Sequence, residues 1–195
     1  MPPSVRFSRE AVLNAAYQLV RREGPNALNA RAVARELGGS TQPIFRLFSG
    51  MEELKQAVTE LALDSWKTSL RDRIQTSAFP YLSIGMGFLL FARDEPELFK
   101  LLFMRDRVSD GSCTDYNVNW GVPLIEDTVK VDVETASKLY ARNWLYCYGL
   151  AVSIATKYIR CISECTMRQL LVDSLQGVAL QLNVELPTLD QCESI

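Results

Sequence analysis

Apolar residues recur every three or four positions along most of the chain, which is the spacing of one face of an α-helix. A first helix is expected to begin after Ser8, a good N-cap residue, and to end before Gly24. Two shorter helices are expected over residues 29–37 and 40–48. The alternation typical of strands is almost absent, so the pattern predicts an all-α fold.

Longer and more apolar segments follow. A fourth helix is expected from Met51 to about Thr76, opened by a capping box of Ser49 and Glu52, and it is long enough to connect two domains. A polar loop is expected over residues 105–119. Two further helices are expected to begin at Phe79-Pro80 and at Asp94-Glu95-Pro96. Three more are expected over residues 122–131, 132–159 and 166–182.

The two short helices are joined by a glycine-containing turn and preceded by a longer helix. This order predicts a helix-turn-helix unit. In such a unit the second short helix lies in the DNA major groove. Ser40, Thr41, Gln42 and Arg46 are expected to point outward from that helix. Glutamine can pair with adenine through two hydrogen bonds, arginine can pair with guanine in the same way, and hydroxyl groups can contact bases or phosphates.

Charge is distributed unevenly along the chain. The whole chain has a net charge of -2, but residues 1–50 carry seven arginines against three glutamates, while the rest carries 14 basic and 20 acidic residues. The two parts are therefore expected to face different partners. The hydrophobic share of 48% is ample for a packed core.

Targeting signals are not evident in the sequence. The N-terminal residues lack the apolar core of a signal peptide, and the longest apolar run, residues 78–92, is about 15 residues and too short to span a bilayer. We therefore expect a cytoplasmic protein with no membrane partner.

The stretch "LGGSTQPIFRLFSGMEEL" resembles the recognition-helix signature of the tetracycline-repressor (TetR) family, and "AVLNAAYQLVRREGPNALNARAVAREL" is similar to the first two helices of that family. The match covers roughly residues 8–60 without a gap. The resemblance implies a three-helix DNA-binding domain in residues 1–50 and a helix over about 51–76 that links the domains. It also implies a C-terminal helical bundle in residues 68–195 for ligand binding and dimerisation.

The chain departs from the family signature at three positions, where Phe45, Leu47 and Met51 replace the usual tyrosine, histidine and lysine. Each change removes a possible phosphate contact, so we expect a modest salt dependence of DNA binding and a larger share of readout from polar residues of the recognition helix. The residues expected to contact DNA are Asn29, Arg31, Ser40, Thr41, Gln42, Pro43, Phe45, Arg46, Leu47 and Met51.

The resemblance also implies a homodimer formed by the last two long helices and a small-molecule pocket enclosed by the middle helices. A dimer suits DNA reading, because two-fold symmetry places two recognition helices about one DNA turn apart. Each aromatic residue at helical spacing can alternatively belong to the core. The residues considered for the pocket are Tyr81, Met86, Phe88, Phe99, Phe103, Trp120, Trp144 and Tyr148.

An enzyme is not expected. The chain has no histidine, which excludes histidine-based catalysis and histidine metal sites, and no phosphate-binding loop is present. No metal or cofactor is expected.

The expected function is a ligand-responsive transcriptional regulator that binds a pseudo-palindromic double-stranded DNA operator as a dimer and is released by a small molecule. A repressor is expected, and the sequence does not distinguish it from an activator. The alternative is a helical protein-interaction or hydrophobic-ligand-binding protein that keeps the helix-turn-helix scaffold without specific DNA binding.

Overall fold

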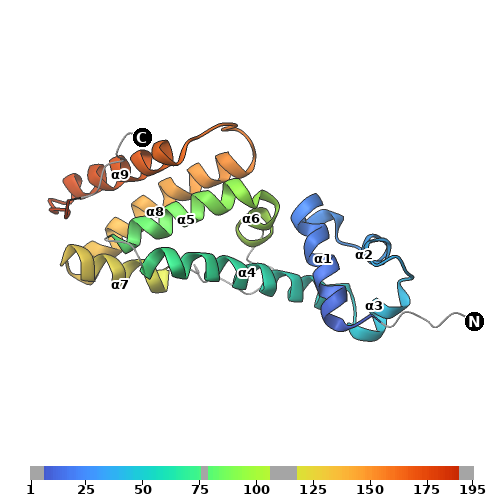
Figure 1. Ribbon diagram of the computed structural model, residues 1–195. Helices are drawn as coiled ribbons and strands as arrows, with labels where there is room; N and C mark the ends of the chain where they lie inside the picture. Colours follow the sequence, from blue (N-terminus) through green and yellow to red (C-terminus); the bar gives the residue numbers. More distant parts are fainter. Residues whose placement is uncertain (1–6, 76–78, 106–117, 189–195) are drawn as a thin grey trace, which may run out of the picture. The chain divides into compact units, whose positions relative to one another are not determined.

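The computed structural model describes residues 7–75, 79–105 and 118–188 (Figure 1). No strand occurs among these residues, which confirms the predicted all-α fold. None of the described helices combines the length and the apolar character needed to cross a membrane. The helices are α1 (Arg9–Glu23), the 3-10 helix η1 (Pro25–Ala27), α2 (Ala30–Glu36), α3 (Gln42–Leu47), α4 (Met51–Gln75), α5 (Pro80–Asp94), α6 (Pro96–Phe103), α7 (Val118–Val129), α8 (Val133–Ala155) and α9 (Glu164–Gln181).

The described residues fall into two compact units. Among the described residues, the first unit contains 7–67 together with Glu95–Arg105, and the second contains 68–75, 79–94 and 118–188. Helix α4 therefore contributes its first part to one unit and its end to the other. Helix α6, which the sequence analysis grouped with the C-terminal domain, belongs to the first unit and packs against α1 and η1.

The core of the first unit forms where apolar helix faces meet. Helix α1 buries Val12, Ala16 and Leu19, whose spacing of four and three residues places them on one face. Trp66 of α4 meets Phe103 of α6 edge to face, with ring centroids 5.2 Å apart and an angle of 74° between the ring planes. Burying such large side chains removes apolar surface from water, which stabilises the unit.

Helix α5 forms the centre of the second unit and packs against α7, α8 and α9. Nine of its 15 residues are buried, which explains why its sequence is apolar almost all round instead of on one stripe. Gly87 allows a close approach to the end of α4, because a Cβ atom there would lie 2.4 Å from Cδ2 of Leu70.

Local chemistry sets most helix ends as the sequence predicts. The Oγ atom of Ser8 accepts a hydrogen bond from the backbone N–H of Ala11 at 3.1 Å, which caps α1. Helix α1 ends at Glu23, directly before Gly24. Side-chain oxygens that accept N–H groups of the first turn satisfy donors that have no partner within the helix.

The predicted capping box of Ser49 and Glu52 is wrong. The backbone N–H of Ser49 donates instead to Oε2 of Glu53 at 2.6 Å, and Glu52 pairs with Lys55 at 2.7 Å. Helix α4 begins at Met51, so the third helical position, from which a glutamate can reach back, is Glu53.

Three boundaries also differ from expectation. Helix α3 begins at Gln42 instead of Ser40, and α7 begins at Val118, four residues earlier than expected. Helix α8 ends at Ala155 instead of about residue 159, because Lys157 has a φ of +61°, which a right-handed helix does not allow. Most of the expected loop over residues 105–119 lies outside the described residues.

The turn between α2 and α3 depends on a left-handed residue. Gly38 has a φ of +66°, and its N–H donates to the carbonyl of Arg35 at 3.1 Å. The N–H of Gly39 donates to the carbonyl of Ala34 at 3.0 Å. This pair of bonds is the Schellman motif, which ends a helix and turns the chain sharply.

We expect Gly38→Ala to lower the free energy of unfolding by about 1–2 kcal/mol, because a Cβ atom disfavours the left-handed conformation. Apart from its chain neighbours, no atom of the described residues lies within 4 Å of a Cβ built at Gly38, so the loss reflects backbone conformation and not a clash. Gly38→Asn is the matched control, since asparagine tolerates this conformation, and it should lose less than Gly38→Ala in urea-induced unfolding. Equal losses in the two variants would contradict this account.

Candidate nucleic-acid interface and ligand pocket

Helix α3 buries one face and exposes the other. Ile44 is fully buried and the next residue of that face, Phe48, is 2% exposed. Gln42, Phe45 and Arg46 are exposed and lie three and four residues apart, so they share the opposite face of the helix. The helix therefore presents two polar side chains and one aromatic ring to a partner.

The other residues predicted to bind DNA from this region lie around that face. Ser40 is exposed, and Thr41, at the N-cap position, makes no side-chain hydrogen bond to the helix. The remaining three, Pro43, Leu47 and Met51, are half-buried.

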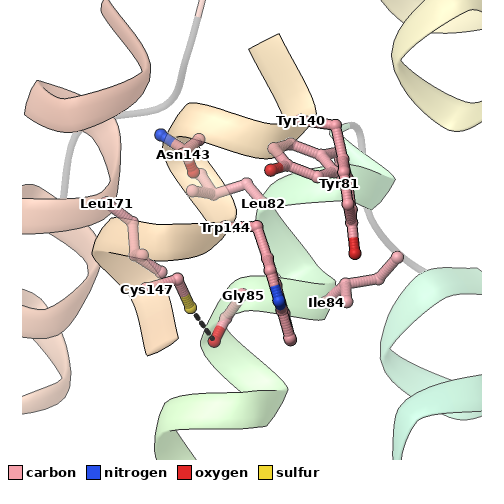
Figure 2. A pocket seen from close by; sticks show the side chains of 9 residues that line it. All are labelled: Tyr81, Leu82, Ile84, Gly85, Tyr140, Asn143, Trp144, Cys147 and Leu171. Atoms are coloured by element: carbon pink, nitrogen blue, oxygen red, sulfur yellow. Dashed lines mark hydrogen bonds between the residues drawn. The ribbon is translucent and has the colours of Figure 1, made fainter. Parts of the chain in front are cut away.

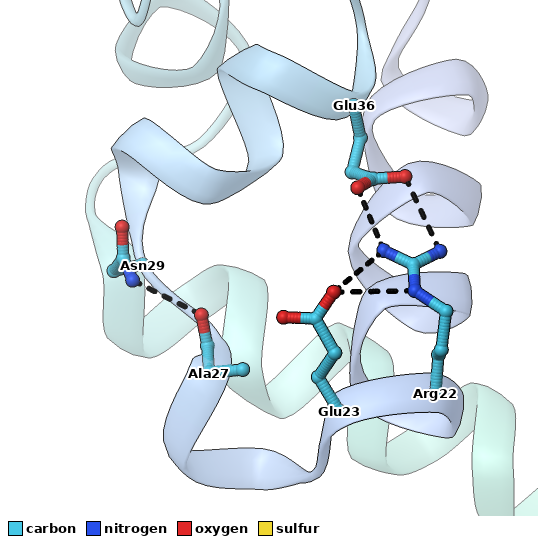
Figure 3. Close-up of polar contacts among 5 residues, drawn as sticks. All are labelled: Arg22, Glu23, Ala27, Asn29 and Glu36. Atoms are coloured by element: carbon cyan, nitrogen blue, oxygen red, sulfur yellow. Dashed lines mark hydrogen bonds and ion pairs between the residues drawn. The ribbon is translucent and has the colours of Figure 1, made fainter.

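The arginines of α1 are all paired with carboxylates. Arg22 joins two helices, because its Nη2 atom lies 2.7 Å from Oε1 of Glu36, at the end of α2, and 2.9 Å from Oε1 of Glu23 (Figure 3). The other two pairs are Arg9 with Glu53 and Arg21 with Glu95. These ion pairs connect elements of the first unit. Because the carboxylates neutralise the guanidinium charges, these arginines attract a negatively charged partner only weakly.

The arginines of α2 and α3 differ from those of α1. Arg31, Arg35 and Arg46 are exposed, and within the described part of the chain none of them forms an ion pair or a side-chain hydrogen bond. Arg31 and Arg35 lie four residues apart on one face of α2, where like charges repel each other. The uncompensated positive charge of this unit is thus concentrated on the helix-turn-helix segment.

Asn29 serves to cap α2. Its Oδ1 atom accepts the backbone N–H of Ala32 at 3.0 Å, and its Nδ2 atom donates to the carbonyl of Ala27 at 3.0 Å (Figure 3). Both ends of the amide are therefore occupied within the protein, which gives Asn29 a structural role in placing α2.

The link between α3 and α4 is fixed by Glu53. Its Oε2 atom accepts the N–H of Ser49, its Oε1 atom lies 2.7 Å from Nη2 of Arg9, and the Arg9 guanidinium lies 4.3 Å from the centre of the Phe48 ring. Two hydrogen bonds lower the pKa of Glu53 from 4.5 to about 2. The bond from the Ser49 backbone has the larger effect, and the bond from Arg9 has the next largest. This cluster connects α1 to the segment that follows α3.

The second unit contains a small pocket between α5, α8 and α9 (Figure 2). Two of the aromatic residues considered from the sequence, Tyr81 of α5 and Trp144 of α8, lie in its wall. The other lining residues are Leu82, Ile84, Gly85, Tyr140, Asn143, Cys147 and Leu171.

The remaining aromatic residues considered for a pocket have other places. Phe88 and Tyr148 contact the Trp144 ring, with ring centroids 4.7 Å and 6.3 Å away, but they do not line the pocket. Phe99 and Phe103 belong to the core of the first unit, where their ring centroids lie 5.1 Å apart. Met86 is half-buried and does not line this pocket, and the side chain of Trp120 lies outside the described residues.

Sequence reasoning missed the polar residue of the pocket, Asn143. The apolar stripe of α8 runs through Ala136, Tyr140, Cys147 and Ala151, and Asn143 occupies the position between the second and third of these. A lone amide on a buried stripe is the signal that could have identified it, because a buried polar group requires a hydrogen-bond partner.

Comparisons with known proteins identify the fold and no more. No family model matches the chain, and no curated protein matches it in sequence. A solved structure of a protein of unknown function from Rhodococcus sp. RHA1 is similar, with a TM-score of 0.67 and 15% sequence identity, over 93% of this chain and 98% of that one. The two chains share an all-helical architecture over almost their whole lengths.

Because the folded-state pKa of Glu53 is depressed, its contribution to stability is complete above pH 4.5 and disappears as the pH falls to about 2. Glu53→Gln should therefore lower the melting temperature at neutral pH, and the difference from the wild type should shrink through this acid range when followed by circular dichroism. Glu52→Gln is the matched control, since it removes only the exposed pair with Lys55 and should have little effect. A difference that stays constant with pH would contradict the role of the Glu53 carboxylate.

Proposed function

We propose that the protein is a transcriptional regulator that binds double-stranded DNA through α3 and the exposed arginines of α2. The observation that carries the proposal is the concentration of uncompensated charge on these helices. Arg31, Arg35 and Arg46 are free to meet phosphates or bases, whereas the arginines of α1 are neutralised. The resemblance of residues 8–60 to the DNA-binding segment of TetR-family regulators supports the same function.

The exposed face of α3 suits base recognition. Arg46 can donate two hydrogen bonds to guanine, Gln42 can pair with adenine, and the exposed Phe45 ring can contact a thymine methyl group. Arg31 and Arg35 lie on the neighbouring helix, where contacts to phosphate fix position without reading sequence.

A homodimer through α8 and α9 is part of the proposal. Leu145 of α8 and Leu180 of α9 are 73% and 79% exposed, which is unusual for two leucines on neighbouring helices. The two helices pack together, and Nη1 of Arg142, three residues before Leu145, donates to Oε1 of Gln181, the residue after Leu180, at 3.2 Å. A second copy of the chain would bury both leucines and supply the second recognition helix for a pseudo-palindromic operator.

The proposed regulation is release of the DNA by a small molecule that binds in the second unit, so that the protein acts as a repressor. Such coupling is reciprocal: a ligand that weakens operator binding by some factor must itself bind more weakly, by the same factor, when DNA is present. Helix α4 supplies residues to both units and is the proposed transmitter.

Selection of bound sequences from random duplex DNA should enrich a pseudo-palindrome, and Arg46→Ala should relax one base position at a cost of about 1–3 kcal/mol. Arg31→Ala should instead weaken binding to all sequences alike and reduce the slope of log affinity against log salt by about 1. Affinities measured by fluorescence anisotropy at several salt concentrations separate the two effects.

Arg160→Ala is the matched control for these variants, because Arg160 is exposed and has no ion-pair partner among the described residues but belongs to the second unit. Its DNA binding should equal that of the wild type. Binding that is weak, independent of sequence and abolished by moderate salt would overturn the operator proposal and favour a helical ligand-binding protein that does not read DNA.

The combined Leu145→Glu and Leu180→Glu variant should sediment as a monomer under conditions in which the wild type sediments as a dimer, because burying two carboxylates costs more than the contact provides. Val133→Glu is the control, since Val133 is also exposed on α8, at 59%, but is the first residue of that helix, 12 residues before Leu145. A monomeric wild-type protein, or a variant that remains dimeric, would exclude this interface.

A further inference from the structure

Two cysteines lie close together in sequence where the chain passes from α8 to α9. Cys161 belongs to the link between the helices, and Cys165 is the second residue of α9. Both residues are exposed, and neither is in a disulfide bond. Cysteine is among the residue types most often buried in proteins, so packing does not explain two exposed thiols four residues apart.

Irregular backbone precedes the helix that carries the second cysteine. Residues 160–162 belong to no helix, and within the described part of the chain none of them takes part in a backbone–backbone hydrogen bond. Helix α9 is capped by Ser163, whose Oγ atom accepts the backbone N–H of Thr166 at 3.0 Å. The backbone at Cys161 can therefore bend toward the helix without breaking such a bond.

The start of α9 favours the reactive form of Cys165. A disulfide is attacked by a thiolate, and the positive end of the helix dipole stabilises a thiolate in the first turn. Arg168 lies three residues further along α9 and so on the same side of the helix as Cys165. The negative charge of the adjacent Glu164 is partly neutralised, because its Oε1 atom lies 3.0 Å from Nη2 of Arg93.

Cys147 provides the contrast within the same chain. It is buried in α8, and its thiol lies 3.8 Å from the carbonyl oxygen of Gly85. Burial raises the pKa of Cys147 to about 12, so it remains a neutral thiol at physiological pH. Reagents in solution therefore reach Cys161 and Cys165 but not Cys147.

Two accessible thiols at this spacing can react with a small-molecule disulfide in two steps. The thiolate of one cysteine attacks the small disulfide, forms a mixed disulfide and releases one small thiol. The second cysteine then loses its proton and attacks the sulfur of the first cysteine, which forms the bond between the two cysteines and releases the second small thiol. In total the protein gives up two protons and two electrons, and the small disulfide takes them up.

The short separation favours the second step. A link of three residues keeps the second thiol close to the mixed disulfide, at an effective concentration far above that of a thiol on another chain. A disulfide requires Cα atoms about 4.4–6.8 Å apart, which a link of this length can provide. Closure within one chain should therefore be faster than bonding between chains.

We propose that Cys161 and Cys165 are a redox-active pair that closes to a reversible intrachain disulfide when a small-molecule disulfide oxidises it. Cys165 attacks first, and Cys161 resolves the mixed disulfide. The inference does not depend on DNA binding, and its test contains no DNA, so its failure is distinguishable from failure of the proposed function.

Trypsin isolates the pair in one peptide, because Arg160 precedes Cys161 and Arg168 follows Cys165. The other cysteines, Cys113, Cys147 and Cys192, fall in three different peptides. The full chain is incubated with oxidised glutathione, alkylated in denaturant and digested for mass spectrometry. The peptide of residues 161–168 should be lighter by two hydrogen atoms and carry no alkyl group, and dithiothreitol should restore both alkylation sites. The peptide that contains Cys147 is the internal control and should be fully alkylated.

Serine variants separate the two steps. Cys161→Ser should keep glutathione on Cys165, because the thiol that resolves the mixed disulfide is missing. Cys165→Ser should take up glutathione on Cys161 several-fold more slowly. Both positions are exposed and serine is close in size, so both variants should fold like the wild type when checked by circular dichroism.

Three results with the wild type would overturn the inference. They are a mixed disulfide that persists on either cysteine, a pair that remains fully alkylated after oxidation, and a bond between two chains seen by electrophoresis without reducing agent. Equal rates of glutathione uptake by the two serine variants would overturn the assignment of Cys165 as the attacking residue.

Discussion

The candidate interface depends on the burial of one face of α3. A helix of six residues is not stable by itself in water, so its position comes from the contacts of Ile44 and Phe48. The left-handed turn at Gly38 brings the chain into this helix, and the Glu53 cluster holds the segment that leaves it. Because both ends and one face are fixed in this way, the other face can carry side chains selected for a partner.

Charge pairing distinguishes the arginines of α1 from those of α2 and α3. Each arginine of α1 pairs with a glutamate outside that helix, and Arg22 also pairs with Glu23 of α1 itself. The Arg22–Glu36 pair connects α1 to α2. Arg46 has no such bond in the described residues, and its exposure has no structural explanation. The net charge of the whole chain hides this contrast, which becomes visible only when each arginine is examined with its neighbours.

The sequence predicts those features that depend on neighbouring residues. The caps at Ser8 and Asn29 and the helix starts at Pro80 and Pro96 follow from local hydrogen bonding and from proline geometry, and all four are found. The partner of Ser49 was assigned one residue too early, because that choice depends on where α4 begins. The place of α6 in the first unit and the pairing of Asn143 with Ser174 depend on contacts distant in sequence, which a helical pattern does not contain.

The departures of α3 from the family signature also have a physical meaning in this structure. Phe45 is 54% exposed on the same side of α3 as Gln42 and Arg46, so an aromatic ring without a hydroxyl forms part of the face that would meet DNA. Such a ring cannot donate to phosphate, but it can cover a thymine methyl group while its neighbours bond to adjacent bases. Leu47 and Met51 are half-buried and also lack a phosphate-binding group, so in the proposed complex sequence-dependent contacts would supply a larger share of the affinity.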